Sequence, residues 1–77
     1  MNTIGKMMLK AVNSKVEAKK MVAEANLRVL LEQPVGIGEH SNLVCEVEGY
    51  ISEIADADDE LNVLAKLIKQ NPERING

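Results

Sequence analysis

The chain has 77 residues, of which 45% are hydrophobic and 27% are charged, and its formal net charge is −3. This length admits one domain at most, here taken as residues 1–77. The 22 Val, Ile and Leu residues exclude a disordered chain, because disordered segments are poor in these residues. Tyr50 is the single aromatic residue, and such an aliphatic composition suits a narrow contact between helices better than a sheet.

The charges are unevenly distributed along the chain. Residues 1–33 carry six basic and three acidic side chains, whereas residues 34–71 carry two basic and eight acidic ones. A basic half and an acidic half in one short chain predict that the two halves face each other.

The cysteine content and the apolar runs indicate the compartment. A lone cysteine, Cys45, excludes an intramolecular disulfide and fits a reducing environment. No apolar run near the start has the length of a signal peptide, and none approaches membrane-spanning length. We therefore expect a cytoplasmic protein that does not contact the membrane.

Residues 4–33 are predicted to form the first helix, with Asn2 or Thr3 as its N-cap. Apolar residues recur there at alternating spacings of four and three, the repeat of a coiled-coil seam, with one polar interruption, Lys15. The seam comprises Ile4, Met8, Ala11, Lys15, Ala18, Val22, Ala25 and Val29. Further apolar residues lie beside it, namely Val12, Val16, Ala23, Leu27, Leu30 and Leu31. Together they form a stripe wider than one partner helix can cover.

Residues 34–40 are predicted to form a turn. Pro34 disfavours helical geometry in the residue before it, and Gly36 and Gly38 can adopt the backbone conformations that a reversal needs. A loop this short makes the flanking helices antiparallel. Ser41 is the preferred N-cap of the helix that follows.

Residues 41–70 are predicted to form the second helix, followed by a tail over 71–77. Its apolar repeat has no polar interruption and comprises Leu43, Val47, Tyr50, Ile54, Ala57, Leu61, Leu64 and Ile68. On the outer face, Gly49 lies in line with two other small residues, Cys45 and Ser52. Gly49 either lets another helix approach closely or is simply tolerated on a solvated face.

These elements predict an all-α fold, a long antiparallel two-helix hairpin. With the turn centred near Gly36, Lys15 falls opposite Asp58, and we predict a partly buried Lys15–Asp58 pair that fixes the register rather than adding stability. Wide apolar stripes are rare on soluble monomers, so we expect the hairpin to assemble into a four-helix bundle, as a homodimer or higher oligomer.

Few side chains have the types that catalysis or metal binding requires. One short cluster carries metal-ligand types, and it consists of Glu39, His40, Cys45 and Glu46. A zinc site there would need further ligands from carboxylates or another subunit, so the simpler interpretation is a helix start at His40 and a packed Cys45. Residues 36–38 lack the strand and lysine of a phosphate-binding loop, and residues 56–60 lack the EF-hand pattern. We expect no catalytic residue, no metal and no cofactor.

The stretch Pro34-Val-Gly-Ile-Gly-Glu-His-Ser-Asn-Leu43 resembles small uncharacterised helical proteins encoded by tailed phages of marine bacteria. The resemblance covers about residues 28–68. In that group a Pro-Asp pair tends to follow the histidine, where this chain has Ser41-Asn42. The resemblance implies a helical hairpin made inside an infected bacterium, and it implies no activity.

The function that these features favour is a non-enzymatic protein–protein interaction module, an adaptor or a modulator of another protein. An alternative is a nucleic-acid accessory protein that uses the basic side of the first helix: Lys6, Lys10, Lys19, Lys20 and Arg28. The acidic net charge and the lack of stacking aromatic residues disfavour this alternative. A third possibility is a small enzyme with a site shared between subunits near His40 and Cys45.

Overall fold

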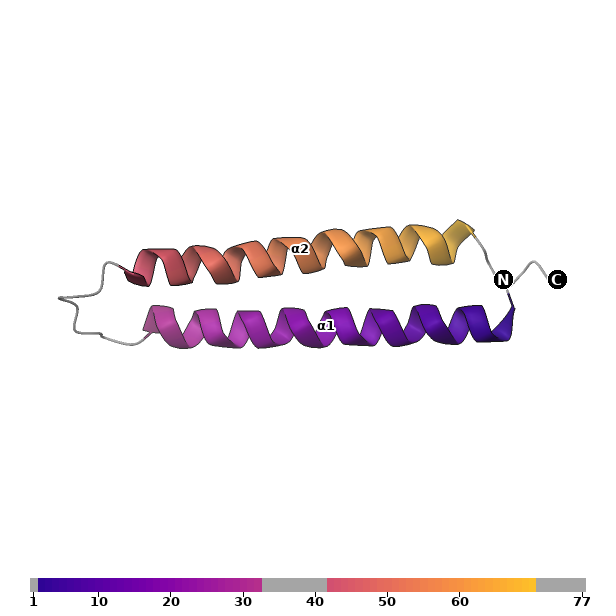
Figure 1. The fold of residues 1–77 in the computed structure, drawn as a ribbon, viewed down its shortest axis with the longest axis horizontal. Helices are drawn as coiled ribbons and strands as arrows, with labels where there is room; N and C mark the ends of the chain where they lie inside the picture. Colours follow the sequence, from indigo (N-terminus) through magenta and orange to yellow (C-terminus); the bar gives the residue numbers. More distant parts are fainter. Residues whose placement is uncertain (1, 33–41, 71–77) are drawn as a thin grey trace.

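A computed structural model describes residues 2–32 and 42–70 of the chain and shows an all-α hairpin. Helix α1 spans Thr3–Glu32 and helix α2 spans Asn42–Gln70. The two helices run side by side in opposite directions, so that the start of α1 lies next to the end of α2 (Figure 1). The predicted helices, 4–33 and 41–70, differ from these bounds by one residue at most.

Several predicted features fall outside the described residues. They are the turn residues Pro34, Gly36 and Gly38, the proposed N-cap Ser41, the side chains of Glu39 and His40, and the tail over 71–77.

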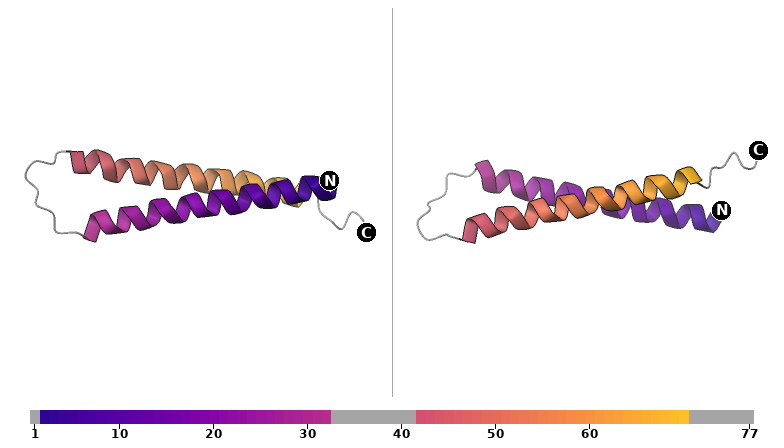
Figure 2. Two further views of the ribbon diagram at one scale, coloured as in Figure 1. Left: turned by 60° about the horizontal axis from the view of Figure 1, so that its bottom comes forward. Right: turned by 90° about the horizontal axis from the view of Figure 1, so that it is seen from above.

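The hairpin is long and thin. Each helix is about 45 Å long at 1.5 Å per residue, and the helix axes cross at a shallow angle (Figure 2). Within the described residues each helix packs against one other helix. Each helix therefore buries one narrow face and leaves most of its circumference exposed.

The start of α1 is capped by Asn2, one of the two predicted candidates. The Asn2 side-chain Oδ1 accepts a hydrogen bond from the backbone N–H of Gly5 at 2.7 Å, and the Asn2 carbonyl accepts one from the N–H of Lys6 at 3.0 Å. The side-chain bond satisfies one of the N–H groups that a helix start leaves without an intrahelical partner.

The buried face of α2 follows its single apolar repeat. Of the eight positions predicted there, all except Ile68 are buried or half-buried. The residues with the least exposure in the hairpin are Val16, Ala23, Ala57 and Leu64, at 1–5%. Val16, Ala57 and Leu64 form one cluster, against which Leu9 and Leu61 pack.

The buried face of α1 differs from the predicted seam. It is formed by a second four-three repeat of the same helix, which comprises Leu9, Asn13, Val16, Lys20, Ala23, Leu27 and Leu30. The predicted seam, from Ile4 to Val29, is exposed along its whole length. Two repeats compete on this helix, and α2 packs on the one that supplies three leucines rather than three alanines. A buried leucine removes more apolar surface from water than an alanine does.

The register differs from the prediction for the same reason. The Asp58 carboxylate lies 2.7 Å from the ammonium group of Lys20, whereas the sequence predicts Lys15 as its partner. Lys20 is the basic residue of the repeat that packs on α2, and Lys15 belongs to the exposed one. The level that faces Asp58 thus lies five residues further along α1 than predicted.

Candidate interaction surface

The most extensive candidate site is the exposed repeat of α1, which we call the outer stripe. It consists of Ile4, Met8, Ala11, Lys15, Ala18, Val22, Ala25 and Val29. The four large apolar side chains in it are 57–65% exposed. Spacings of four and three keep these side chains on one side of the helix over about 38 Å, at 1.5 Å per residue. The outer stripe therefore has the pattern of a helix-packing surface, although α2 does not cover it.

A groove runs beside the middle of the outer stripe, and we call it the central groove. Lys15, Ala18, Lys19 and Val22 of α1 form one wall, and Glu53, Asp56 and Glu60 of α2 form the other. The groove thus combines apolar surface from Ala18 and Val22 with two ammonium groups and three carboxylates. A helix that lies in it would contact both helices of the hairpin.

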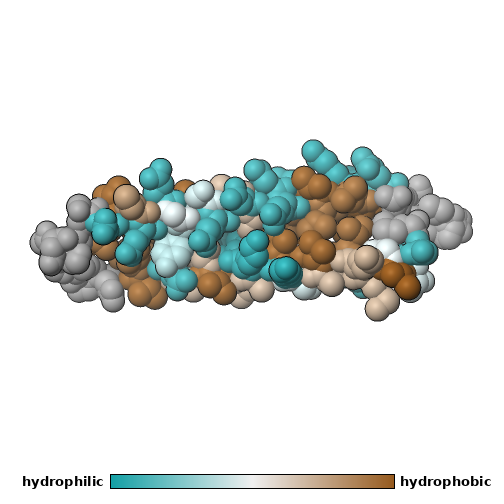
Figure 3. All heavy atoms as spheres, viewed as in Figure 1, coloured by the Kyte–Doolittle hydropathy of each residue, from teal (hydrophilic) through white to brown (hydrophobic). Residues whose placement is uncertain are grey.

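Hydrophobic and hydrophilic side chains separate along the hairpin surface. On the face drawn in Figure 3, hydrophilic side chains gather near the middle, and a broad hydrophobic area spans both helices toward the end where α1 begins. Smaller hydrophobic areas lie toward the opposite end. Lys19 and Lys20, which form ion pairs with α2, also lie near the middle of α1.

Two ion pairs connect the basic helix to the acidic one. Lys20 lies 2.7 Å from Asp58, and Lys19 lies 3.9 Å from Glu60. Hydrogen bonding to Asp58, and then the charge of that carboxylate, raises the pKa of Lys20 above its usual value; Glu24 and Glu17 add smaller contributions, and partial loss of water opposes them. The short Lys20–Asp58 contact is therefore the better defined of the two.

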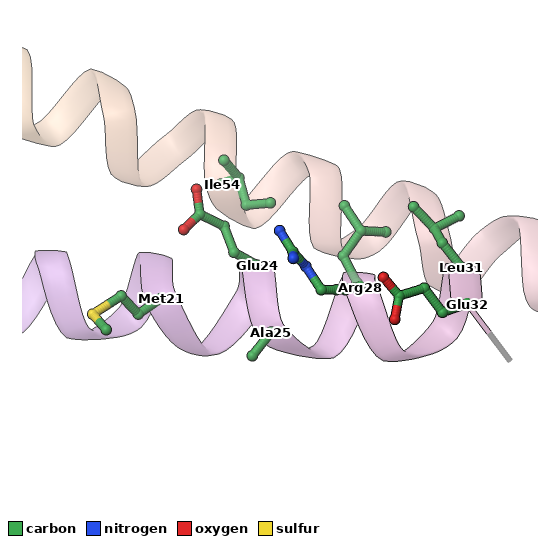
Figure 4. A pocket seen from close by; sticks show the side chains of 8 residues that line it. Met21, Glu24, Ala25, Arg28, Leu31, Glu32 and Ile54 are labelled. Atoms are coloured by element: carbon green, nitrogen blue, oxygen red, sulfur yellow. The ribbon is translucent and has the colours of Figure 1, made fainter.

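A second groove lies along α1 nearer its end (Figure 4). It is lined by Met21, Glu24, Ala25, Leu27, Arg28, Leu31, Glu32 and Ile54. Glu24, Arg28 and Glu32 follow one another along α1, with Ile54 of α2 facing them across the groove (Figure 4). Arg28 thus stands one turn from a glutamate on either side, next to exposed apolar carbon from Leu31. Such a mixture of arginine and apolar surface is typical of protein interfaces.

The structure places the other candidate residues without joining them into a chemical site. Cys45 is exposed and has a free thiol. Among the residues that the structure describes, no three His, Cys, Asp or Glu side chains come together in a way that could hold a metal ion. In the same part of the chain, neither helix is long and apolar enough to cross a membrane.

Gly49 has open space around it. Within the described residues, a Cβ atom added to Gly49 would meet no atom within 4 Å. The hairpin itself therefore imposes no need for glycine at this position.

Sequence reasoning missed the role of Lys20, although a signal was present. Lys20 belongs to a four-three repeat that includes Leu27 and Leu30, and it is the basic residue of that repeat. An acid beside the α2 seam, Asp58, indicated that the partner repeat would carry a base at the same level. Because both repeats of α1 carry one lysine, charge alone does not choose between Lys15 and Lys20.

The described surface consists of an exposed apolar stripe and two open grooves lined by charged and apolar side chains. Both grooves are open on the outside of the hairpin, whereas small-molecule sites usually enclose most of their ligand. Comparison with family models, with curated proteins and with solved structures finds no match to this chain.

Proposed function

We propose that the protein is a non-enzymatic interaction module that self-associates, as a four-helix bundle homodimer, and presents its remaining surface to another protein. The observation that carries this proposal is the exposed outer stripe, eight positions in coiled-coil spacing that α2 leaves uncovered. Contiguous apolar patches of this kind are rare on soluble monomers and mark interaction surfaces.

The exposure of the large apolar side chains in the outer stripe supports self-association. Ile4, Met8, Val22 and Val29 are 57–65% exposed. A second copy packed on this surface would remove these side chains from water, which is favourable.

The surface left over after self-association would carry the adaptor or modulator role. The groove that holds Arg28 between Glu24 and Glu32 shares Ala25 with the outer stripe, but its three charged side chains lie outside that stripe. It offers charge of both signs beside the exposed Leu31. A helix or extended segment with one basic and one acidic side chain would match it.

The nucleic-acid alternative receives less support from the structure. Lys19 and Lys20 lie within ion-pair distance of Glu60 and Asp58, so a phosphate backbone would compete with carboxylates for them. If the basic side of α1 did bind nucleic acid, affinity would fall steeply as salt rises. A titration with duplex and single-stranded DNA at low salt tests this, and we expect no binding.

Sedimentation equilibrium over a wide range of concentrations tests the proposal directly. We expect a mass twice that of the 8.4 kDa chain, falling to the monomer only at high dilution. Val22→Glu puts a charge in the middle of the outer stripe and should shift the population to monomer. Met21→Glu is the matched control, since Met21 is equally exposed but lies outside the outer stripe. A monomer at every concentration would refute self-association, and a higher oligomer would refute the dimer.

A further inference from the structure

We propose that the partner on the outer stripe is the α1 helix of a second copy, packed antiparallel so that Ala11 of one copy lies opposite Val22 of the other and Lys15 opposite Ala18. This inference rests on the self-association proposed above and specifies the helix, its direction and its register. A twofold axis relates the two copies, so that the same outer stripe is used by both, as in an isologous dimer.

The alternation of side-chain size within the outer stripe selects the antiparallel direction. One set of positions, seven residues apart, holds Ala11, Ala18 and Ala25, and the other set holds larger side chains such as Met8 and Val22. In an antiparallel pair each set faces the other, so large side chains fill the space above alanines.

A parallel pair of the same stripes would pack poorly. Symmetry would then place each residue against its own copy, so that Ala18 would face Ala18 and leave a gap. Lys15 would face Lys15, and two like charges in contact are unfavourable. The antiparallel register removes the gap between alanines, and it places each Lys15 against an alanine with the two Lys15 residues about 4.5 Å apart along the axis instead of directly opposite each other.

The charges of the central groove select α1 rather than α2 as the occupant. The groove already holds Lys15 and Lys19 against three carboxylates of α2, Glu53, Asp56 and Glu60. A second α1 brings further lysines to this acidic wall, because residues 1–33 carry six basic and three acidic side chains. An α2 helix, with seven acidic and two basic side chains over Asn42–Gln70, would bring more negative charge to that wall than α1 does.

The extent of the outer stripe is sufficient for a stable dimer. In the proposed register the stripes overlap from residue 4 to residue 29, about 38 Å of helix. A helix pair of this length is of the scale of a standard interface of about 800 Å² per partner.

Disulfide trapping in the full chain tests direction and register. Cys45→Ser removes the exposed native thiol, and Ala11→Cys or Val22→Cys is added to this background in separate chains that carry different mass tags. The two chains are unfolded together, refolded and mildly oxidised. We expect mixed disulfide dimers to exceed like-with-like dimers at least tenfold.

The geometry explains the expected preference. In the proposed register the two Ala11 positions lie about 16 Å apart along the axis, far beyond the roughly 7 Å between Cα atoms that a disulfide spans. Met21→Cys in the same background is the control, because Met21 is exposed outside the outer stripe. It should form no dimer above the background seen with freely diffusing thiols.

The outcomes separate this inference from the proposed function. Like-with-like disulfides in excess would show a parallel pair and overturn the inference. A dimer by sedimentation that forms no disulfide at either position would place the interface on another surface, and self-association would still stand. A monomer by sedimentation, with no disulfide, would refute both proposals.

Discussion

Leu64→Ala tests which face of the hairpin holds it together. Leu64 is 5% exposed and belongs to the cluster with Val16 and Ala57. The change removes three carbon atoms, worth about 0.8 kcal/mol each when buried. Because a two-helix contact is open at its sides, the cavity left behind adds little, and we expect a loss of about 2–3 kcal/mol, the low end for leucine cores.

Urea unfolding followed by circular dichroism, at one fixed protein concentration, measures this loss. With a slope of about 1 kcal/mol per molar urea for so small a protein, the midpoint should fall by about 2 M. Leu31→Ala is the matched control: Leu31 is 64% exposed, and its truncation should cost less than about 1 kcal/mol. If Leu64→Ala fails to fold, Leu64→Val provides a smaller step of about 1 kcal/mol. Equal losses for the variants at positions 64 and 31 would refute the assignment of the buried face.

Three further changes test the helix ends, the open glycine and the cross-helix ion pair. Gly49→Ala should stabilise the hairpin by about 1 kcal/mol in thermal unfolding, because nothing described lies near the added methyl group; a loss would show that an assembly packs against this site. Asn2→Ala should cost about 1 kcal/mol and lower helicity at the start of α1, since the bond to Gly5 is lost. Because Asp58 raises the pKa of Lys20, the folded chain holds that proton more tightly than the unfolded chain does. The stabilisation is complete below the ordinary lysine pKa of about 10.4 and is lost as pH rises through the higher folded-state value. Asp58→Asn should therefore flatten the fall in stability in alkaline titrations, and an unchanged profile would contradict the pairing.

The two helices differ in how far their packing could be predicted from sequence. In α2 a single uninterrupted repeat from Leu43 to Leu64 leaves one choice of face, and the buried residues follow it. In α1 two repeats of similar length lie on different sides, and each carries one lysine. The choice depends on how much more favourable it is to bury the leucines of one repeat than the alanines of the other. The spacing of apolar residues does not show this difference.

The same ambiguity explains what sequence could say about the candidate site. The spacing of the outer stripe from Ile4 to Val29 is typical of helix packing, and the sequence predicts this stripe as the contact face of the first helix. Whether it meets the chain's own α2 or something outside the hairpin depends on which competing repeat α2 occupies. Within the hairpin α2 packs on the repeat that contains Lys20, which lies 2.7 Å from Asp58, and Lys15 is exposed.

The position of the best-packed cluster has a consequence for how the hairpin folds. Val16, Ala57 and Leu64, with Leu9 and Leu61, join segments far apart in the chain. Near the connection between the helices, loop closure is entropically cheap, but side chains there such as Leu30 and Leu43 are only half-buried. Between the connection and this cluster the fully buried residue of α1 is the small Ala23. Zipping outward from the connection therefore buries few large side chains until the distant segments meet. The folding transition state should contain the Leu9–Leu64 end of the hairpin, so that folding is slower and more cooperative than local helix contacts alone would give.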